Sequence, residues 1–135
     1  MTRAAEPSEH QEQTRLISWW NWNCKRWNLP TYALMAVPNG GARHIAVAAK
    51  LKAEGVRSGV PDLFLAAPLK SEMFPGNPWE SPGLWIELKR KPNKPSKEQI
   101  EVIDYLRGNG YDVVVAWTAD EAIRAIEGYL GATNY

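Results

Sequence analysis

The chain has 135 residues, of which 44% are hydrophobic and 23% charged, and its formal net charge is +1. This length and composition are typical of one globular domain, residues 1–135, with a single hydrophobic core. The net charge gives no general argument for nucleic-acid binding. No run is apolar enough to cross a membrane or to form a signal-peptide core, and the single cysteine fits a reducing compartment. We therefore expect a cytoplasmic protein without a membrane partner.

The N-terminal part predicts one amphipathic helix after a short disordered lead, residues 1–7. Ser8 and Gln11 have the spacing of a capping box, and the helix would run from about Glu9 to Trp27. Its apolar face would carry Leu16, Trp20, Cys24 and Trp27.

Polar residues stand near the start of the same helix face. Glu9, Glu12 and Gln13 lie one to two turns before the apolar residues. Carboxylates are unusual there unless the helix end borders a polar cleft. The helix dipole explains Glu9, and Glu12 less well.

A short strand over residues 31–37 is followed by Pro38-Asn39-Gly40-Gly41, which is typical of a turn. Residues 42–54 are helical in composition, and Gly55 is suited to end that helix. The turn therefore leads into a helix N-terminus, where backbone N–H groups and Arg43 could hold a phosphate.

Two strand-like apolar runs, residues 59–65 and 84–90, carry charges that a buried strand would normally reject. Side chains alternate along a strand, so Glu87 and Lys89 share one face while Leu84, Ile86 and Leu88 share the other. If the first run pairs beside the second, Asp62 joins Glu87 and Lys89 in one cleft.

Two converging carboxylates suit a hard divalent cation such as Mg²⁺, which prefers oxygen ligands and keeps several waters. A neighbouring lysine can orient or deprotonate the attacking water, or neutralise charge that builds on a phosphate. This chemistry suits phosphodiester hydrolysis. The alternative is that Glu87 and Lys89 form the solvated face of a half-exposed strand, and that Asp62 only begins a strand after a proline turn.

The remaining elements complete a small α/β domain. Residues 68–82 are rich in proline and predict a surface loop. Ser96 with Gln99 predicts a capped helix to about Arg107, with Ile100, Ile103 and Leu106 inward. Residues 113–116 predict a buried strand, and Thr118 begins the last helix. The predicted order is α-β-α-β-β-α-β-α, a small mixed sheet flanked by helices.

Basic residues are grouped in two segments, residues 43–57 and 89–97. Such groups can contact phosphates, although a charge run is more often a solvated face. The candidate nucleic-acid contacts are Asn39, Arg43, Lys52, Arg57, Arg90, Lys91 and Lys94.

This order of elements resembles the PD-(D/E)xK nuclease superfamily, whose motif stands here as Pro61-Asp62 and Glu87-x-Lys89. The resemblance is closer to its VRR-NUC branch, which includes stand-alone phage and bacterial proteins. Further points of similarity are Glu9, Glu12 and Gln13 in the first helix, Pro38-Asn39-Gly40-Gly41, residues 51–62, Arg90, Ser96-x-x-Gln99 and Gly110-Tyr111-x-Val113. Together they cover roughly residues 9–130.

The resemblance implies a restriction-endonuclease-like fold and a metal-dependent DNA endonuclease that acts on branched DNA, such as four-way (Holliday) junctions, as a homodimer. Asp62, Glu87 and the Leu88 carbonyl would bind Mg²⁺ or Mn²⁺, with Lys89 beside the attacking water. A first-helix carboxylate would complete the site; Glu9 and Glu12 both fit, and we expect Glu12. Gln99 resembles a family glutamine near the site. The long 68–82 loop departs from compact members.

Two other functions stay open. The first is a non-catalytic or accessory DNA-binding module of replication or repair with the same fold, which the absence of Asp62, Glu87 or Lys89 would favour; all three are present. The second is a nuclease acting on RNA or on other DNA structures, because phosphodiester hydrolysis on such a sheet does not itself select the nucleic acid.

Overall fold

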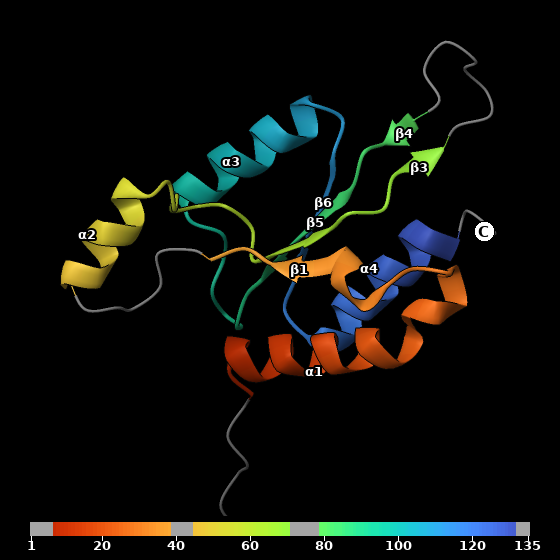
Figure 1. Ribbon diagram of the computed structural model, residues 1–135. Coiled ribbons are helices and arrows are strands. Elements are labelled where there is room, and N and C mark those ends of the chain that lie inside the picture. The colour runs from red at the N-terminus through yellow and green to blue at the C-terminus, as the bar shows by residue number, and fades with distance from the viewer. Residues whose placement is uncertain (1–6, 39–44, 71–78, 132–135) are drawn as a thin grey trace, which may run out of the picture.

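The computed structural model describes residues 7–38, 45–70 and 79–131 (Figure 1). The α-helices in these ranges are α1 (Glu9–Asn23), α2 (Ile45–Ala53), α3 (Lys97–Gly108) and α4 (Ala119–Gly131). The strands are β1 (Leu34–Ala36), β2 (Leu63–Leu65), β3 (Leu69–Lys70), β4 (Trp79–Ser81), β5 (Leu84–Leu88) and β6 (Asp112–Ala116). Short 3₁₀ turns span Cys24–Trp27 and Thr31–Ala33.

The central sheet has four strands in the order β1-β2-β5-β6. β2 is antiparallel to both β1 and β5, whereas β5 and β6 are parallel. In the β2–β5 register, Leu63 lies opposite Ile86 and Leu65 lies opposite Leu84. The predicted small mixed sheet flanked by helices is confirmed.

Helices lie on both faces of this sheet. α1 and α4 pack together on one face, and α3 lies on the other, against β6 (Figure 1). α2 projects to one side of the molecule, and none of its nine residues is buried. The sheet face under α3 is therefore only partly covered, which leaves room for a cleft at one end of the strands.

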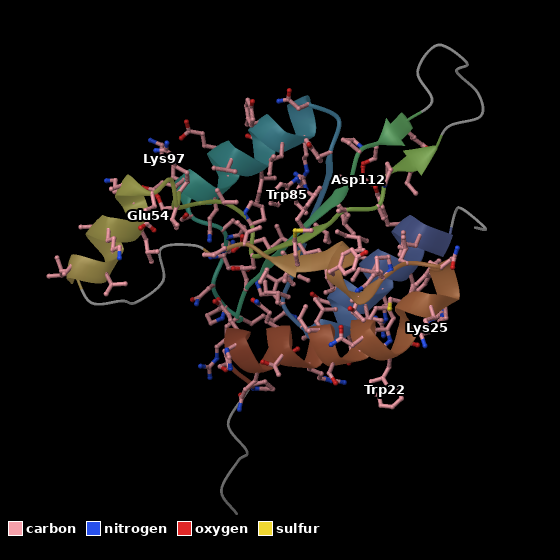
Figure 2. All side chains as sticks on the ribbon, viewed as in Figure 1. Trp22, Lys25, Glu54, Trp85, Lys97 and Asp112 are labelled. Atoms are coloured by element: carbon pink, nitrogen blue, oxygen red, sulfur yellow. The ribbon has the colours of Figure 1, made fainter. Side chains whose placement is uncertain are left out.

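The core lies between the sheet and the α1–α4 layer. The predicted apolar face of the first helix is buried there: Leu16, Trp20, Cys24 and Trp27 are at most 6% exposed. Strand residues that face this layer include Leu63, Leu65, Ile86 and Leu88, and α4 contributes Ala122, Ile126 and Leu130. Trp19 packs against the same core, whereas Trp22 is 86% exposed and projects from α1 away from the sheet (Figure 2).

Three local predictions differ from the structure. Residues 68–82 are not only a loop, because β3 and β4 pair there as a two-stranded antiparallel hairpin outside the main sheet. The first helix changes to a 3₁₀ turn at Cys24 and ends before Asn28, which has a positive φ of 56°. Ile100 is 49% exposed rather than inward, because α3 meets the sheet through its Ile103 side.

The described part of the chain contains no helix that is long and apolar enough to cross a membrane. Residues 39–41 of the predicted turn, including Asn39, and the predicted phosphate contact Arg43 lie outside the described residues.

Candidate active site

The strand register brings Asp62 and Glu87 together. Leu63 pairs with Ile86, so Asp62, just before β2, comes opposite Glu87 on the neighbouring strand. Both side chains lie on the sheet face away from the α1–α4 core, in the row next to Phe64 and Trp85, whose rings are 4.5 Å apart. The predicted alternation therefore places the carboxylates on the less covered face of the sheet.

A proline at the end of the strand pairing leaves the Leu88 N–H free to bond a side chain instead of the neighbouring strand. The Lys89 N–H donates to the Ala116 carbonyl on the β6 side, so the Leu88 N–H and C=O point toward β2. The residue opposite Leu88 is Pro61, which has no N–H to give to the Leu88 carbonyl. The Leu88 N–H instead donates to Asp62 Oδ2 at 2.7 Å. Asp62 is thus oriented by the backbone N–H of Leu88, the residue next to Glu87.

Glu87 is the unusual residue of the site, because it is a carboxyl that is only 2% exposed. Its Oε1 accepts a hydrogen bond from Gln99 Nε2 at 3.0 Å. Its buried Oε2 accepts from no donor among the described residues, and the protonated Glu87 carboxyl shares a side-chain hydrogen bond with Asp62. Burial, followed by the nearby Asp62 carboxylate, raises the pKa of Glu87 from 4.5 to about 8, and Lys89 opposes this shift. A buried carboxyl with an unused oxygen beside a second carboxylate fits a divalent cation.

The first helix contributes Glu9, not Glu12, to this cleft. Glu9 lines the cleft, and its Oε1 accepts from the Arg90 N–H at 3.2 Å. Glu12 is buried elsewhere: its Oε2 accepts a short hydrogen bond from the N–H of Ala119, the first residue of α4. A carboxylate is favourable there because a helix N-terminus exposes N–H groups and carries partial positive charge. The packing of α1 on α4 therefore places Glu12 at a helix end and away from the cleft.

The resulting cleft has a volume of about 290 Å³. Its walls include Glu9, Asp62, Glu87, Lys89, Gln99 and the segment 58–60. In residues 7–38, 45–70 and 79–131, no three His, Cys, Asp or Glu side chains are gathered into a metal-binding group. The cleft thus offers a paired carboxylate site, the kind that Mg²⁺ completes with waters and substrate phosphates.

The chain matches the family model of the VRR-NUC domain over residues 4–120. It belongs to the VRR-NUC family. This is a family of nuclease domains, so the predicted resemblance is confirmed and a nuclease-like role is supported. A solved structure described as a VRR_NUC domain protein shares the fold, with a TM-score of 0.71 and 24% sequence identity over 95% of this chain and 92% of that chain. A search of curated proteins finds no match.

Exposed basic residues lie on both segments that lead to and from the cleft of this VRR-NUC domain. Lys52 is on α2, and Arg57 precedes the cleft segment 58–60. Arg90, Lys91 and Lys94 follow Lys89 in the connection to α3. All five side chains are exposed, so they are available to contact phosphates.

Sequence reasoning did not identify two polar residues of the cleft, Ser58 and Glu98, which line it and hydrogen-bond each other at 2.7 Å. They are 40 positions apart; Ser58 lies in the family-like stretch 51–62 and Glu98 within Ser96-x-x-Gln99, but neither had been assigned a role. Gln99 was predicted near the site from its resemblance to a family glutamine; the structure contains its capping box with Ser96 and also brings it to Glu87.

Proposed function

We propose that this VRR-NUC domain is a Mg²⁺- or Mn²⁺-dependent endonuclease that hydrolyses phosphodiester bonds in branched DNA, such as four-way junctions. The observation that carries the proposal is the buried Glu87 carboxyl beside Asp62 and Lys89, whose Oε2 accepts from no donor in the part of the chain that the structure describes. Burial of this carboxyl in its charged form costs free energy of folding. A cation that binds it would offset this cost.

In the proposed site, Asp62, Glu87 and the Leu88 carbonyl would hold the metal ion, and Glu9, which lines the same cleft, would be the first-helix carboxylate. The bound metal supplies Lewis acidity and a water of lowered pKa. Gln99 keeps one oxygen of Glu87 engaged through its amide, which leaves the other oxygen for the cation. The donor set is all oxygen, as hard divalent cations prefer.

Lys89 has a separate role in the proposal. It lines the cleft, follows the β5 carboxylate by two residues and is half-buried, so its ammonium group is partly desolvated. A cation in this position orients the attacking water and stabilises the negative charge that develops on the phosphate. Lys89 therefore acts on the reacting phosphate rather than on the fold.

Recognition of DNA is proposed to depend on backbone contacts and shape. The exposed residues Lys52, Arg57, Arg90, Lys91 and Lys94 flank the cleft, and contacts of lysine and arginine with phosphates position a protein without reading sequence. Such recognition fits a substrate defined by its branch geometry.

A homodimer is part of the proposal, because two cuts at a symmetric junction need two sites related by a two-fold axis. Trp22 on α1, 86% exposed, and Ile45 and Val47 on α2, 86% and 46% exposed, lie at different ends of the molecule, so each is a separate candidate for the subunit contact (Figure 1 and Figure 2). Light scattering coupled to gel filtration measures the mass directly.

The test of the nuclease is a cleavage panel. End-labelled four-way junction, flap, linear duplex and single-stranded DNA, and a matched RNA junction, are incubated with protein and Mg²⁺, Mn²⁺ or EDTA. We expect metal-dependent cutting confined to branched DNA. Binding without cutting under every metal condition would instead assign a non-catalytic DNA-binding module, and preferential cutting of the RNA junction would change the substrate class.

A further inference from the structure

The amide of Gln99 has only one orientation compatible with its neighbours. Its Oε1 accepts from the Ser96 N–H at 2.8 Å, and its backbone N–H donates to Ser96 Oγ at 3.2 Å. Because the carbonyl end is engaged in this helix cap, the NH₂ end is directed at Glu87 Oε1, 3.0 Å away. The position of the α3 N-terminus therefore determines where the Gln99 donor lies.

A second contact holds the α3 N-terminus against the segment that leads to Asp62. Ser58 Oγ donates to Glu98 Oε2 at 2.7 Å. The next residue, Gly59, has a φ of +86°, and a Cβ there would lie 2.9 Å from the Glu98 carbonyl oxygen. The backbones of the two segments are thus packed as closely as glycine allows.

These contacts join the segment that leads to Asp62 and the helix end that carries the Gln99 donor to Glu87. Asp62 follows Gly59 within one short segment, and Gln99 directly follows Glu98. A shift of the α3 N-terminus relative to segment 58–60 would move the Gln99 donor away from Glu87 and would change its position relative to Asp62.

We propose that Ser58 and Glu98 are positioning residues, which fix the first turn of α3 against segment 58–60 so that the Gln99 amide stays on Glu87. Only the expected effect on metal affinity rests on the proposed metal-dependent function; the contact itself does not. Ser58 and Glu98 are exposed, and a hydrogen bond between exposed side chains adds little to net stability. Its loss is therefore expected to affect the site more than the fold.

The test is Mn²⁺ affinity, measured by calorimetry, for Ser58→Ala, Glu98→Ala and the double variant. We expect each single change to weaken affinity about threefold to tenfold, less than for a group that bonds a metal ligand directly. The double variant should lose no more than either single variant, because both remove the same contact. Ser58→Thr, which retains a hydroxyl, should restore affinity.

The Gln99→Ala background separates positioning from a general effect. Ser58→Ala should cause no further loss of affinity there, because Ser58 acts through Gln99. An equal loss in both backgrounds, or no loss in either, would overturn the proposal. Glu101→Ala, which removes an exposed carboxylate from the same helix, is the matched control and should leave affinity unchanged.

A readout without metal distinguishes this proposal from the proposed function. The side-chain amide resonances of Gln99 in an NMR spectrum of the metal-free protein should move in Ser58→Ala and Glu98→Ala, and stay in place in Glu101→Ala. Wild-type protein that binds no Mn²⁺ would refute the metal-dependent function, while these resonances would still report on the contact. Unmoved resonances in both variants would refute the positioning role.

Discussion

At the scale of single residues, Glu87 and Lys89 divide the work of the cleft. Glu87 is enclosed, with one oxygen held by Gln99 and the other without a donor among the described residues, whereas Lys89 is half-buried just after the same strand. The two positions differ by one strand repeat, so both side chains face the cleft. Their removal should therefore give different defects.

Lys89→Ala should lower the rate of DNA cleavage by about a hundredfold or more, because a cation that acts on the reacting phosphate is lost. Its DNA affinity and melting temperature should change little. Single-turnover cleavage and a binding titration measure the two effects. Arg90→Ala is the control: this exposed neighbour should weaken DNA binding and leave the rate at saturating DNA nearly intact. Cleavage by Lys89→Ala at the wild-type rate would contradict the assigned role.

The pH dependence of the metal-free protein should report on Glu87. Its pKa is raised from 4.5 in an ordinary environment to about 8 in the fold. The unfolded chain therefore releases this proton at lower pH than the native state does, and the free energy of unfolding should fall as pH rises through this window. Urea titrations at several pH values should show a smaller fall for Glu87→Gln, which has no proton to release.

Mn²⁺ affinity should change with pH in the opposite sense. Below the pKa of about 8, a proton on Glu87 competes with the cation, so affinity should rise as pH increases toward that value. Calorimetry in buffers of different ionisation enthalpy counts the proton released on binding. An affinity that is constant between pH 6 and 8 would show that the metal displaces no proton from Glu87 when it binds.

At the scale of elements, the first residue of α1 lines the cleft, whereas the next turn of the helix contacts α4. Glu9 faces the cleft, and Glu12 accepts from the α4 N-terminus. The helical repeat puts both residues near one face, and only the placement of α4 decides between them. The sequence left Glu9 and Glu12 both open, and Glu12 was expected because the helix dipole explains it less well than Glu9. Periodicity gives the face of a helix, but not which neighbour each turn of that face meets.

Substitutions should separate the two glutamates. Glu12→Ala leaves a buried N–H of α4 unpaired and should cost about 1–3 kcal/mol of unfolding free energy, with Mn²⁺ affinity retained in the folded fraction. Glu9→Ala should weaken Mn²⁺ binding and change stability little. Thermal unfolding and calorimetry on both variants measure this. The reverse pattern would return the first-helix ligand to Glu12.

Elsewhere, local sequence patterns correctly predicted features that depend on neighbouring residues, and they missed contacts between distant parts of the chain. The alternation along residues 84–89 placed Glu87 and Lys89 on one face, and the capping box placed Gln99 at a helix start. The Ser58–Glu98 contact joins residues 40 positions apart and had no local signal. The β3–β4 hairpin was missed because its strands are short and flanked by prolines, which by themselves indicate a loop.

At the scale of the whole molecule, the net charge is small, but basic side chains are concentrated beside the cleft. A net charge of +1 coexists with exposed basic residues on both segments that flank the cleft. DNA affinity should therefore depend on these residues and on salt, not on the overall charge.

The double variant Lys91→Gln and Lys94→Gln should weaken binding to all DNA shapes. It should also reduce the slope of log affinity against log salt by about 0.9 for each lost phosphate contact. Fluorescence anisotropy over a salt series measures the slope. Lys25→Gln, an exposed lysine in the 3₁₀ turn after α1 (Figure 2), is the control and should keep the wild-type slope. An unchanged slope in the double variant would exclude these residues from the DNA contact.

Helix α2 is not packed into the core, so changes to it should affect the surface beside the cleft more than the stability of the fold. A nine-residue helix that buries no side chain adds little to the cooperative core, and such backbone tolerates replacement. It nevertheless carries Lys52 and leads directly into the cleft segment 58–60. This stretch is therefore a natural site for engineering: a longer or differently charged helix between β1 and β2 should change the charge beside the cleft while leaving the carboxylate-bearing sheet intact.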